Sequence, residues 1–154
     1  MLRLQRSTGK NDDFIALVKK LDAYLATTDG DEHAFYDQFN GIEQLNTVVI
    51  AYENNTPVAC GAFKTKNNGR AEVKRMYCEP NYRNRGYAGL VLNELERWAE
   101  ESDYQTIILE TGARQIEAVQ FYEKNGYRRV PNYPPYEGMK NSHCYEKNIQ
   151  WLQL

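Results

Sequence analysis

The chain has 154 residues, of which 42% are hydrophobic and 26% charged, and its 19 basic and 21 acidic side chains give a formal net charge of −2 at pH 7. This length favours one globular domain over residues 1–154, and the charge balance argues against a generally basic surface for nucleic acid. The longest apolar runs, such as residues 48–52, are too short to span a bilayer.

Two further patterns restrict where the protein works and what it binds. Residues 1–6 lack the apolar block of a signal peptide. The three cysteines are an odd number without a C-x-x-C pair, and there are only two histidines, so a zinc site is not expected. We therefore expect a cytoplasmic protein without a metal, a nucleic-acid partner or a membrane partner.

The N-terminal third predicts one strand followed by two helices. Leu2 and Leu4 alternate with polar residues, as in a strand. Apolar residues between positions 14 and 25 then recur every three or four positions, which predicts an amphipathic helix whose cap is one of the polar residues 11–13. Residues 31–39 predict a second, short helix.

The next segment predicts an antiparallel meander of three strands. Residues 47–53, 57–66 and 71–78 are rich in residues that favour strands. Asn54-Asn55 separates the first two runs, and Asn67-Asn68-Gly69 separates the second and third. Asn and Gly adopt positive φ at low cost, so both pairs of runs are predicted to be joined by tight turns.

The C-terminal half alternates helices with strands. Periodicity predicts helices over residues 88–101 and 114–125 and strands over 105–110, 127–130 and 143–149. The first of these helices is long enough to be the crossover between parallel strands, so strand 105–110 is predicted to run parallel to strand 71–78. The fold class is therefore α/β (α+β), with a mixed central sheet of about six to seven strands and flanking helices.

The loop before helix 88–101 has the features of a phosphate site. Its sequence is Arg83-Asn84-Arg85-Gly86-Tyr87-Ala88-Gly89. The first turn of a helix leaves backbone N–H groups unpaired and favours an anion, while the glycines let a ligand approach the backbone closely. A loop with two surface arginines and a glycine turn is the plain alternative, because the pattern alone is short.

Two spaced motifs resemble the GNAT family of N-acetyltransferases. Residues 72–80 and 82–88 are similar to the acetyl-CoA motif of that family, which reads Q/R-x-x-G-x-G/A at Arg83 to Ala88. Residues 117–127 are similar to its A-x-x-x-Y-x-x-x-G-F/Y helix, although Gln115 stands where the family often has Asn. Residues 109–112 and 142–147 resemble a bacterial subgroup with poorly defined substrates. The resemblance implies the acyl-CoA N-acyltransferase (GNAT) fold, with acetyl-CoA as cosubstrate.

In that family the strand before the loop separates from its neighbour, and pantetheine inserts beside it with its amides paired to the backbone. A backbone N–H of the same stretch would stabilise the thioester oxygen as charge develops on it. The residues that the resemblance assigns to acetyl-CoA are Met76, Tyr77, Cys78, Arg83, Asn84, Arg85, Gly86, Tyr87, Ala88, Gly89 and Gln115.

The resemblance also suggests two catalytic residues. An amine with a pKa of ~10.4 is almost entirely charged at pH 7, so a base must remove a proton before attack. Glu72 is the candidate base, with Glu110 as the second choice, and the alternative for Glu72 is a surface residue paired with Lys74 or Arg70. Tyr122 is the candidate acid for the departing thiolate, and the alternative is a tyrosine that only packs in the core.

The predicted function is N-acetyl transfer from acetyl-CoA to a primary amine of a small molecule or peptide, by direct attack in a ternary complex. The alternative is a non-catalytic acyl-CoA-binding or sensor domain on the same fold. The acceptor is either a cationic amine that meets Glu72, Glu110 or Asp37, or an amino acid whose carboxylate meets Arg128 or Arg129. The protein is expected to be a monomer or a homodimer.

Overall fold

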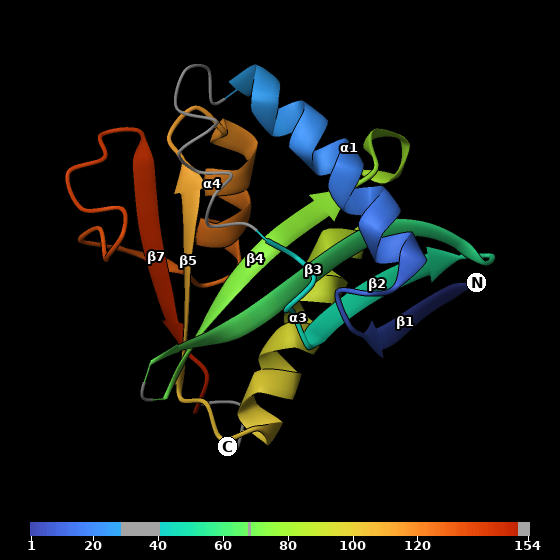
Figure 1. Ribbon diagram of the computed structural model, residues 1–154, viewed down its shortest axis with the longest axis horizontal. Helices are drawn as coiled ribbons and strands as arrows, with labels where there is room; N and C mark the ends of the chain where they lie inside the picture. The colour runs from blue at the N-terminus through green and yellow to red at the C-terminus, as the bar shows by residue number, and fades with distance from the viewer. Residues whose placement is uncertain (29–40, 68, 151–154) are drawn as a thin grey trace.

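The computed structural model of the chain describes residues 1–28, 41–67 and 69–150. Its seven strands form one mixed sheet in the order β1-β2-β3-β4-β5-β7-β6 (Figure 1). The strands are β1 (Leu2–Ser7), β2 (Thr47–Glu53), β3 (Thr56–Asn67), β4 (Arg70–Cys78), β5 (Thr106–Gly112), β6 (Arg128–Val130) and β7 (Ser142–Asn148). The helices are α1 (Asp12–Thr28), α3 (Tyr87–Glu101) and α4 (Ile116–Lys124), with a 3-10 turn η2 (Pro80–Tyr82). The helix expected over residues 31–39 lies outside the described residues.

The predicted mixed α/β sheet is therefore confirmed, and its N-terminal part is an antiparallel meander from β1 to β4. Helix α1 begins after Asn11, whose Oδ1 accepts hydrogen bonds from the backbone N–H groups of Asp13 and Phe14 at 2.8 and 3.2 Å. Of the three polar residues 11–13, Asn11 is therefore the N-cap of α1, because its side chain accepts hydrogen bonds from two of the free N–H groups of the first turn.

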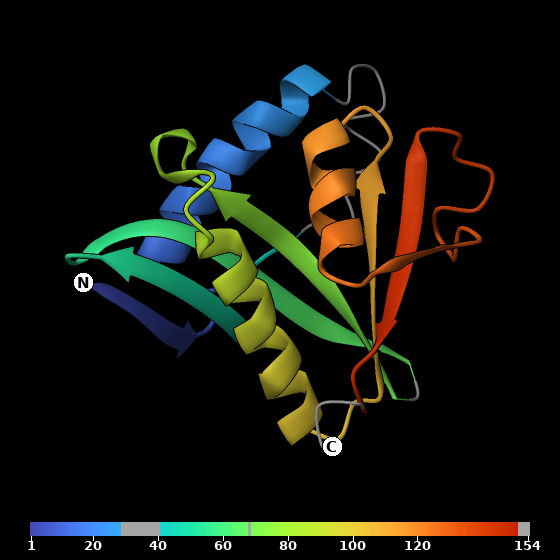
Figure 2. The same cartoon turned by 180° about the vertical axis from the view of Figure 1, so that it is seen from behind.

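Helices cover both faces of the sheet (Figures 1 and 2). Helix α1 lies on one face, where its apolar side packs on β2 and β3, and α3 and α4 lie on the other. Val91 and Leu95 of α3 are completely buried there, as their helical spacing predicted, and Leu92 is buried beside them. Trp98, the third residue expected on this face, is only partly buried. Ile116 is an exception to the predicted apolar face of α4, because it is 65% exposed at the first position of the helix. Within the described ranges, no helix has the length and apolar character needed to cross a membrane.

The junction between β4 and β5 determines where a site can form. The two strands are adjacent and parallel, as predicted, but they pair only through Arg70↔Thr106, Ala71↔Ile107 and Glu72↔Ile108. Beyond these three pairs the strands diverge toward their C-terminal ends, which Figure 1 shows as a widening gap between the two arrows. The ends of these two strands face each other without backbone pairing.

A β-bulge accompanies this divergence. Lys74 pairs with Ala62 and Tyr77 with Cys60, so two residues of β4 lie opposite the single residue Gly61 of β3. Arg75 is the additional residue, with φ at +61°. A Cβ at Gly61 would lie 2.3 Å from the Met76 Sδ, so the glycine leaves the space that the Met76 side chain occupies. The sequence predicted a regular strand here, since a bulge depends on the partner strand as much as on the bulged one.

Candidate active site

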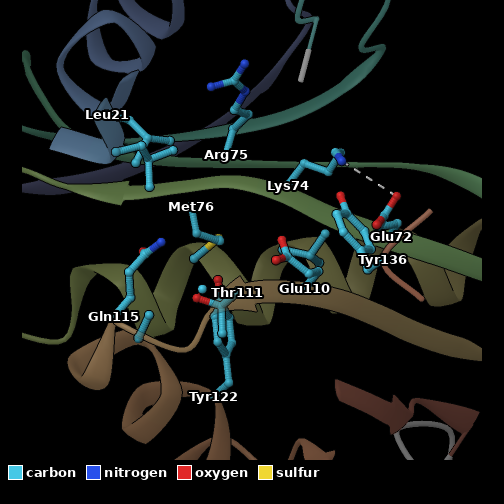
Figure 3. A pocket seen from close by; sticks show the side chains of 14 residues that line it. Leu21, Glu72, Lys74, Arg75, Met76, Glu110, Thr111, Gln115, Tyr122 and Tyr136 are labelled. Atoms are coloured by element: carbon cyan, nitrogen blue, oxygen red, sulfur yellow. Dashed lines mark ion pairs between the residues drawn. The ribbon is translucent and has the colours of Figure 1, made fainter. Parts of the chain in front are cut away.

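A pocket opens where β4 and β5 diverge, and Figure 3 shows it from close by. The two strands form its walls, α4 closes one side and α1 the other. The lining side chains that could take part in chemistry are Glu72, Lys74, Glu110, Thr111, Gln115, Tyr122 and Tyr136. Both predicted catalytic residues, Glu72 and Tyr122, and the second-choice base Glu110 therefore lie around one space.

Tyr122 reaches the pocket from α4. It is 8% exposed, and its ring contacts Phe121 and Tyr127 edge-on, with centroids 5.2 and 5.9 Å away. Within the described part of the chain, its hydroxyl has no hydrogen-bond partner. Burial raises the pKa of Tyr122 above its usual range, and the Glu110 carboxylate adds to that rise. The phenol is therefore held in its protonated form, with its proton available to a group in the pocket.

Glu72 lies on β4 and is only 2% exposed, so the alternative interpretation of Glu72 as a surface residue is wrong. The Tyr133 hydroxyl donates a hydrogen bond to its Oε2 at 2.7 Å. Its Oε1 lies 3.8 Å from the ammonium of Lys74 and 3.9 Å from that of Lys64. Lys74 is one of the two partners suggested for Glu72 from the sequence. Lys64 and Tyr133 are partners that the sequence did not indicate. These partners hold the carboxyl group of Glu72 in a fixed position in the wall of the pocket.

Lys74 is a site residue that the motif comparison did not assign. Its side chain is 8% exposed and points toward Glu72 in Figure 3. Burial lowers the pKa of Lys74, and the neighbouring Glu72 carboxylate opposes this shift. The signal in the sequence was the presence of Glu72 and Lys74 two positions apart in an interior strand, which places two charges on one face.

The C-terminal part of β4 has the free edge that the resemblance implied. Met76, Tyr77 and Cys78 follow the last residue of β4 that pairs with β5, so no strand among the described residues covers that edge. Cys78 is half-buried, and its carbonyl oxygen accepts a hydrogen bond from Arg83 Nε at 3.0 Å. Gln115 lines the same pocket from the N-terminal end of α4.

The predicted phosphate loop leads into α3 with an open first turn. Asn84 and Gly86 have φ values of +64° and +86°, and Gly86 is the N-cap of the helix. A Cβ at Gly86 or Gly89 would have no heavy atom within 4 Å, so the space over both glycines, beside Ala88, is free. This is the geometry that allows an anion to approach backbone N–H groups.

The aromatic and basic residues of this loop are tied to their surroundings. The Arg83 guanidinium is directed inward to the Cys78 carbonyl, whereas Arg85 is 54% exposed and lies 3.7 Å from Glu53. The hydroxyl of Tyr87 donates a hydrogen bond to the same Glu53 carboxylate. The two arginines thus differ: Arg83 fixes the loop to the end of β4, and Arg85 supplies an accessible charge.

The sheet order, the divergence of β4 and β5 and the glycine loop define the class of acyl-CoA N-acyltransferases, whose fold this chain shares. The chain belongs to the acetyltransferase (GNAT) family, whose model matches residues 16–127. A curated relative from Azospirillum brasilense, an IAA acetyltransferase, is 28% identical over 86% of this chain and 88% of its own length.

Solved structures agree with this membership. A crystal structure from Klebsiella pneumoniae, described as an acyl-CoA N-acyltransferase, has a TM-score of 0.82 and 28% identity over 97% of this chain and 98% of that one. A GNAT acetyltransferase from Elizabethkingia anophelis with acetyl-CoA bound has a TM-score of 0.69 and 17% identity over 96% and 97% of the two chains. The second likeness concerns the fold alone.

Proposed function

We propose that the protein transfers an acetyl group from acetyl-CoA to a primary amine by direct attack in a ternary complex. One observation supports this most strongly: a protonated, buried tyrosine without a hydrogen-bond partner in the described chain faces the same pocket as two carboxylates. A site with a proton donor and candidate proton acceptors on opposite walls suits a reaction that moves one proton in and one out.

Acetyl-CoA fits the free surfaces around this pocket. The pyrophosphate would lie against the backbone of residues 85–89, where the positive φ of Gly86 and the open space at Gly89 leave room. The 54% exposed side chain of Arg85 would add positive charge there. Pantetheine would follow the uncovered edge of β4 along residues 76–78, with Gln115 on the facing side. Bound in this way, acetyl-CoA supplies the acetyl thioester to the pocket.

Glu72 would accept the proton of the incoming ammonium, directly or through water, and Glu110 is the alternative base. The neutral amine nitrogen then forms a bond to the acetyl carbon, and the carbon–sulfur bond breaks. A backbone N–H of residues 76–78 would stabilise the oxygen of the tetrahedral intermediate. The Tyr122 hydroxyl gives its proton to the thiolate, and the second proton lost from the amine nitrogen restores that hydroxyl. The products are therefore an acetylated amine, CoA thiol and the one proton released by the base.

The test is thiol release from acetyl-CoA during incubation with a panel of amines, with the acetylated product identified by mass spectrometry. We expect release that requires both the protein and an amine. Matched variants Glu72→Gln and Glu110→Gln then identify the base, because loss of a positioned base typically costs ~10²- to 10⁴-fold in rate. Tight binding of acetyl-CoA without transfer to any amine would contradict the proposal and support the non-catalytic alternative.

A further inference from the structure

A second pocket adjoins the candidate active site on the far side of Glu72. It shares Glu72, Lys74 and Tyr136 with the first pocket and is completed by Lys64, Lys66 and the Pro134-Pro135 segment. The two spaces therefore have these three residues as a common wall.

The register of the sheet explains why charge accumulates here. Lys64 of β3 lies directly opposite Glu72 of β4, and Lys74 is two positions along β4 from Glu72 on the same face. Lys66 lies at a register shift between Thr65 and Asn67, and its side chain also lines the pocket. The apolar cluster under α1 ends at residues such as Ala62 and Cys60, before these lysines. The segment between β6 and β7 covers them from the other side through Tyr133 and Tyr136. Three ammonium groups thus line this second pocket with a single carboxylate.

The partners of these groups leave the pocket cationic. The Lys66 Nζ donates to the Pro134 carbonyl oxygen at 2.6 Å and lies 5.0 Å from the Tyr133 ring centroid. Lys64 and Lys74 approach Glu72 only at 3.9 and 3.8 Å, which is too long for a hydrogen bond. Within the described residues, no hydrogen bond from the buried Lys74 ammonium is present.

A buried ammonium with donors to spare is stabilised by a further anion. Burial lowers the pKa of Lys74, so a ligand carboxylate would relieve the cost of keeping it charged. A cationic group in the second pocket, by contrast, would meet three lysines beside Glu72. The alternative carboxylate site at Arg128 or Arg129 is not supported, because neither residue lines either pocket and Arg128 pairs with Glu146 at 2.6 Å.

We infer that the acceptor is an amine that also carries a carboxylate, which binds Lys64 and Lys74 in the second pocket while its amine faces the first pocket, where Glu72, Glu110 and Tyr122 lie. This inference rests on the proposed function for the transfer itself. It names the substrate class as amino acids or short acidic peptides, and Lys74 as the residue that determines specificity.

The experiment compares matched amines that differ in one group. Each ω-amino acid is assayed for CoA thiol release beside its carboxamide, the aminoalkyl phosphonate of the same length and a diamine. We expect kcat/KM for the acid to exceed that for the amide by about 10- to 100-fold, the range of one or two charge-assisted hydrogen bonds. A phosphonate preferred over the carboxylate would overturn the choice of carboxylate.

Variants then show which residues make the protein prefer the acid over the amide. In Lys74→Met and Lys64→Met the ratio of kcat/KM between acid and amide should fall toward one, whereas Lys10→Met, a change of an exposed lysine outside both pockets, should keep it. Lys64 is 44% exposed, so its variant tests the idea even if Lys74→Met fails to fold. Equal use of acid and amide by the wild type would overturn the inference and leave the proposed function intact.

A binding measurement separates the two proposals if no transfer occurs. Calorimetry with CoA present compares an N-acetyl amino acid with its N-acetyl amide. Tighter binding of the acid that is lost in Lys64→Met supports the carboxylate subsite even without catalysis. Equal or undetectable binding of both compounds would overturn the subsite.

Discussion

The two halves of the sheet are each antiparallel, and they meet in one short parallel stretch. Strands β1 to β4 are paired along their lengths, and α1 covers that half with an apolar face. Strands β5 to β7 are joined to it by three residue pairs only, and every candidate for chemistry lies where that pairing ends. The comparison teaches that the incomplete junction between the two halves provides the backbone edge and the space that a reaction needs.

The largest expected effect is a loss of turnover when Tyr122, in the pocket between β4 and β5, is changed. Tyr122→Phe keeps the ring and its contacts with Phe121 and Tyr127 but removes the hydroxyl. We expect kcat to fall by ~10²- to 10⁴-fold with little change in acetyl-CoA affinity, because a general acid acts only as charge develops on sulfur. Stopped assays on a confirmed acceptor measure this, with the exposed Tyr24→Phe as control. An unchanged turnover number would return Tyr122 to a packing role.

The second prediction concerns the β-bulge in the half formed by strands β1 to β4. Gly61→Ala places a Cβ 2.3 Å from the Met76 Sδ and 3.0 Å from the Leu95 Cδ1. We expect a loss of ~1–3 kcal/mol in the free energy of unfolding, since extra volume in a packed core displaces its neighbours. Denaturant unfolding measures it, with Gly41→Ala, where the nearest side-chain atom is 4.0 Å away, as the control. Equal stability of both variants would show that the bulge accommodates the methyl group.

The third prediction separates stability from binding at the start of α3. Gly89→Ala meets nothing within 4 Å and removes a flexible residue from a helix, so stability should rise by ~0.5–1 kcal/mol. The same methyl group stands where the pyrophosphate would approach, so acetyl-CoA affinity should fall. Gly86 is less suitable for this test, because its φ of +86° would strain any side chain. Calorimetry showing unchanged affinity would argue against the proposed phosphate position.

The smallest expected effect is on the pH profile. Burial keeps the Tyr122 pKa above its ordinary value of ~10, so the proton donor stays loaded through the alkaline range. We therefore expect kcat to show no descending limb from Tyr122 between about pH 8 and 10. A descending limb in that range that disappears in Tyr122→Phe would contradict the raised pKa.

Local patterns predicted the frame of this protein well. The Asn11 cap, the meander and the glycine turn into α3 each depend on residues close in sequence, and the length of 88–101 was enough to predict the parallel crossover. The site was harder, because its contacts join distant segments. The Glu72–Tyr133 hydrogen bond spans 61 positions, and the bulge at Arg75 depends on Gly61 of the partner strand. A single sequence carries no local signal for such pairings.

The additional residue in β4 has a consequence for how this site could be lost. Lys74 and Tyr77 face the α1 side and Met76 faces α3, so without Arg75 the remaining residues would still alternate correctly, and Met76 would stand opposite Gly61. A deletion of one codon would therefore repair the ladder and straighten the strand, while removing the ion pair between Arg75 and Asp22. Loss of Arg75 would thus improve the pairing of β3 with β4 but disturb the site where β4 leaves β5. We therefore expect β4 to tolerate substitutions more readily than changes in length.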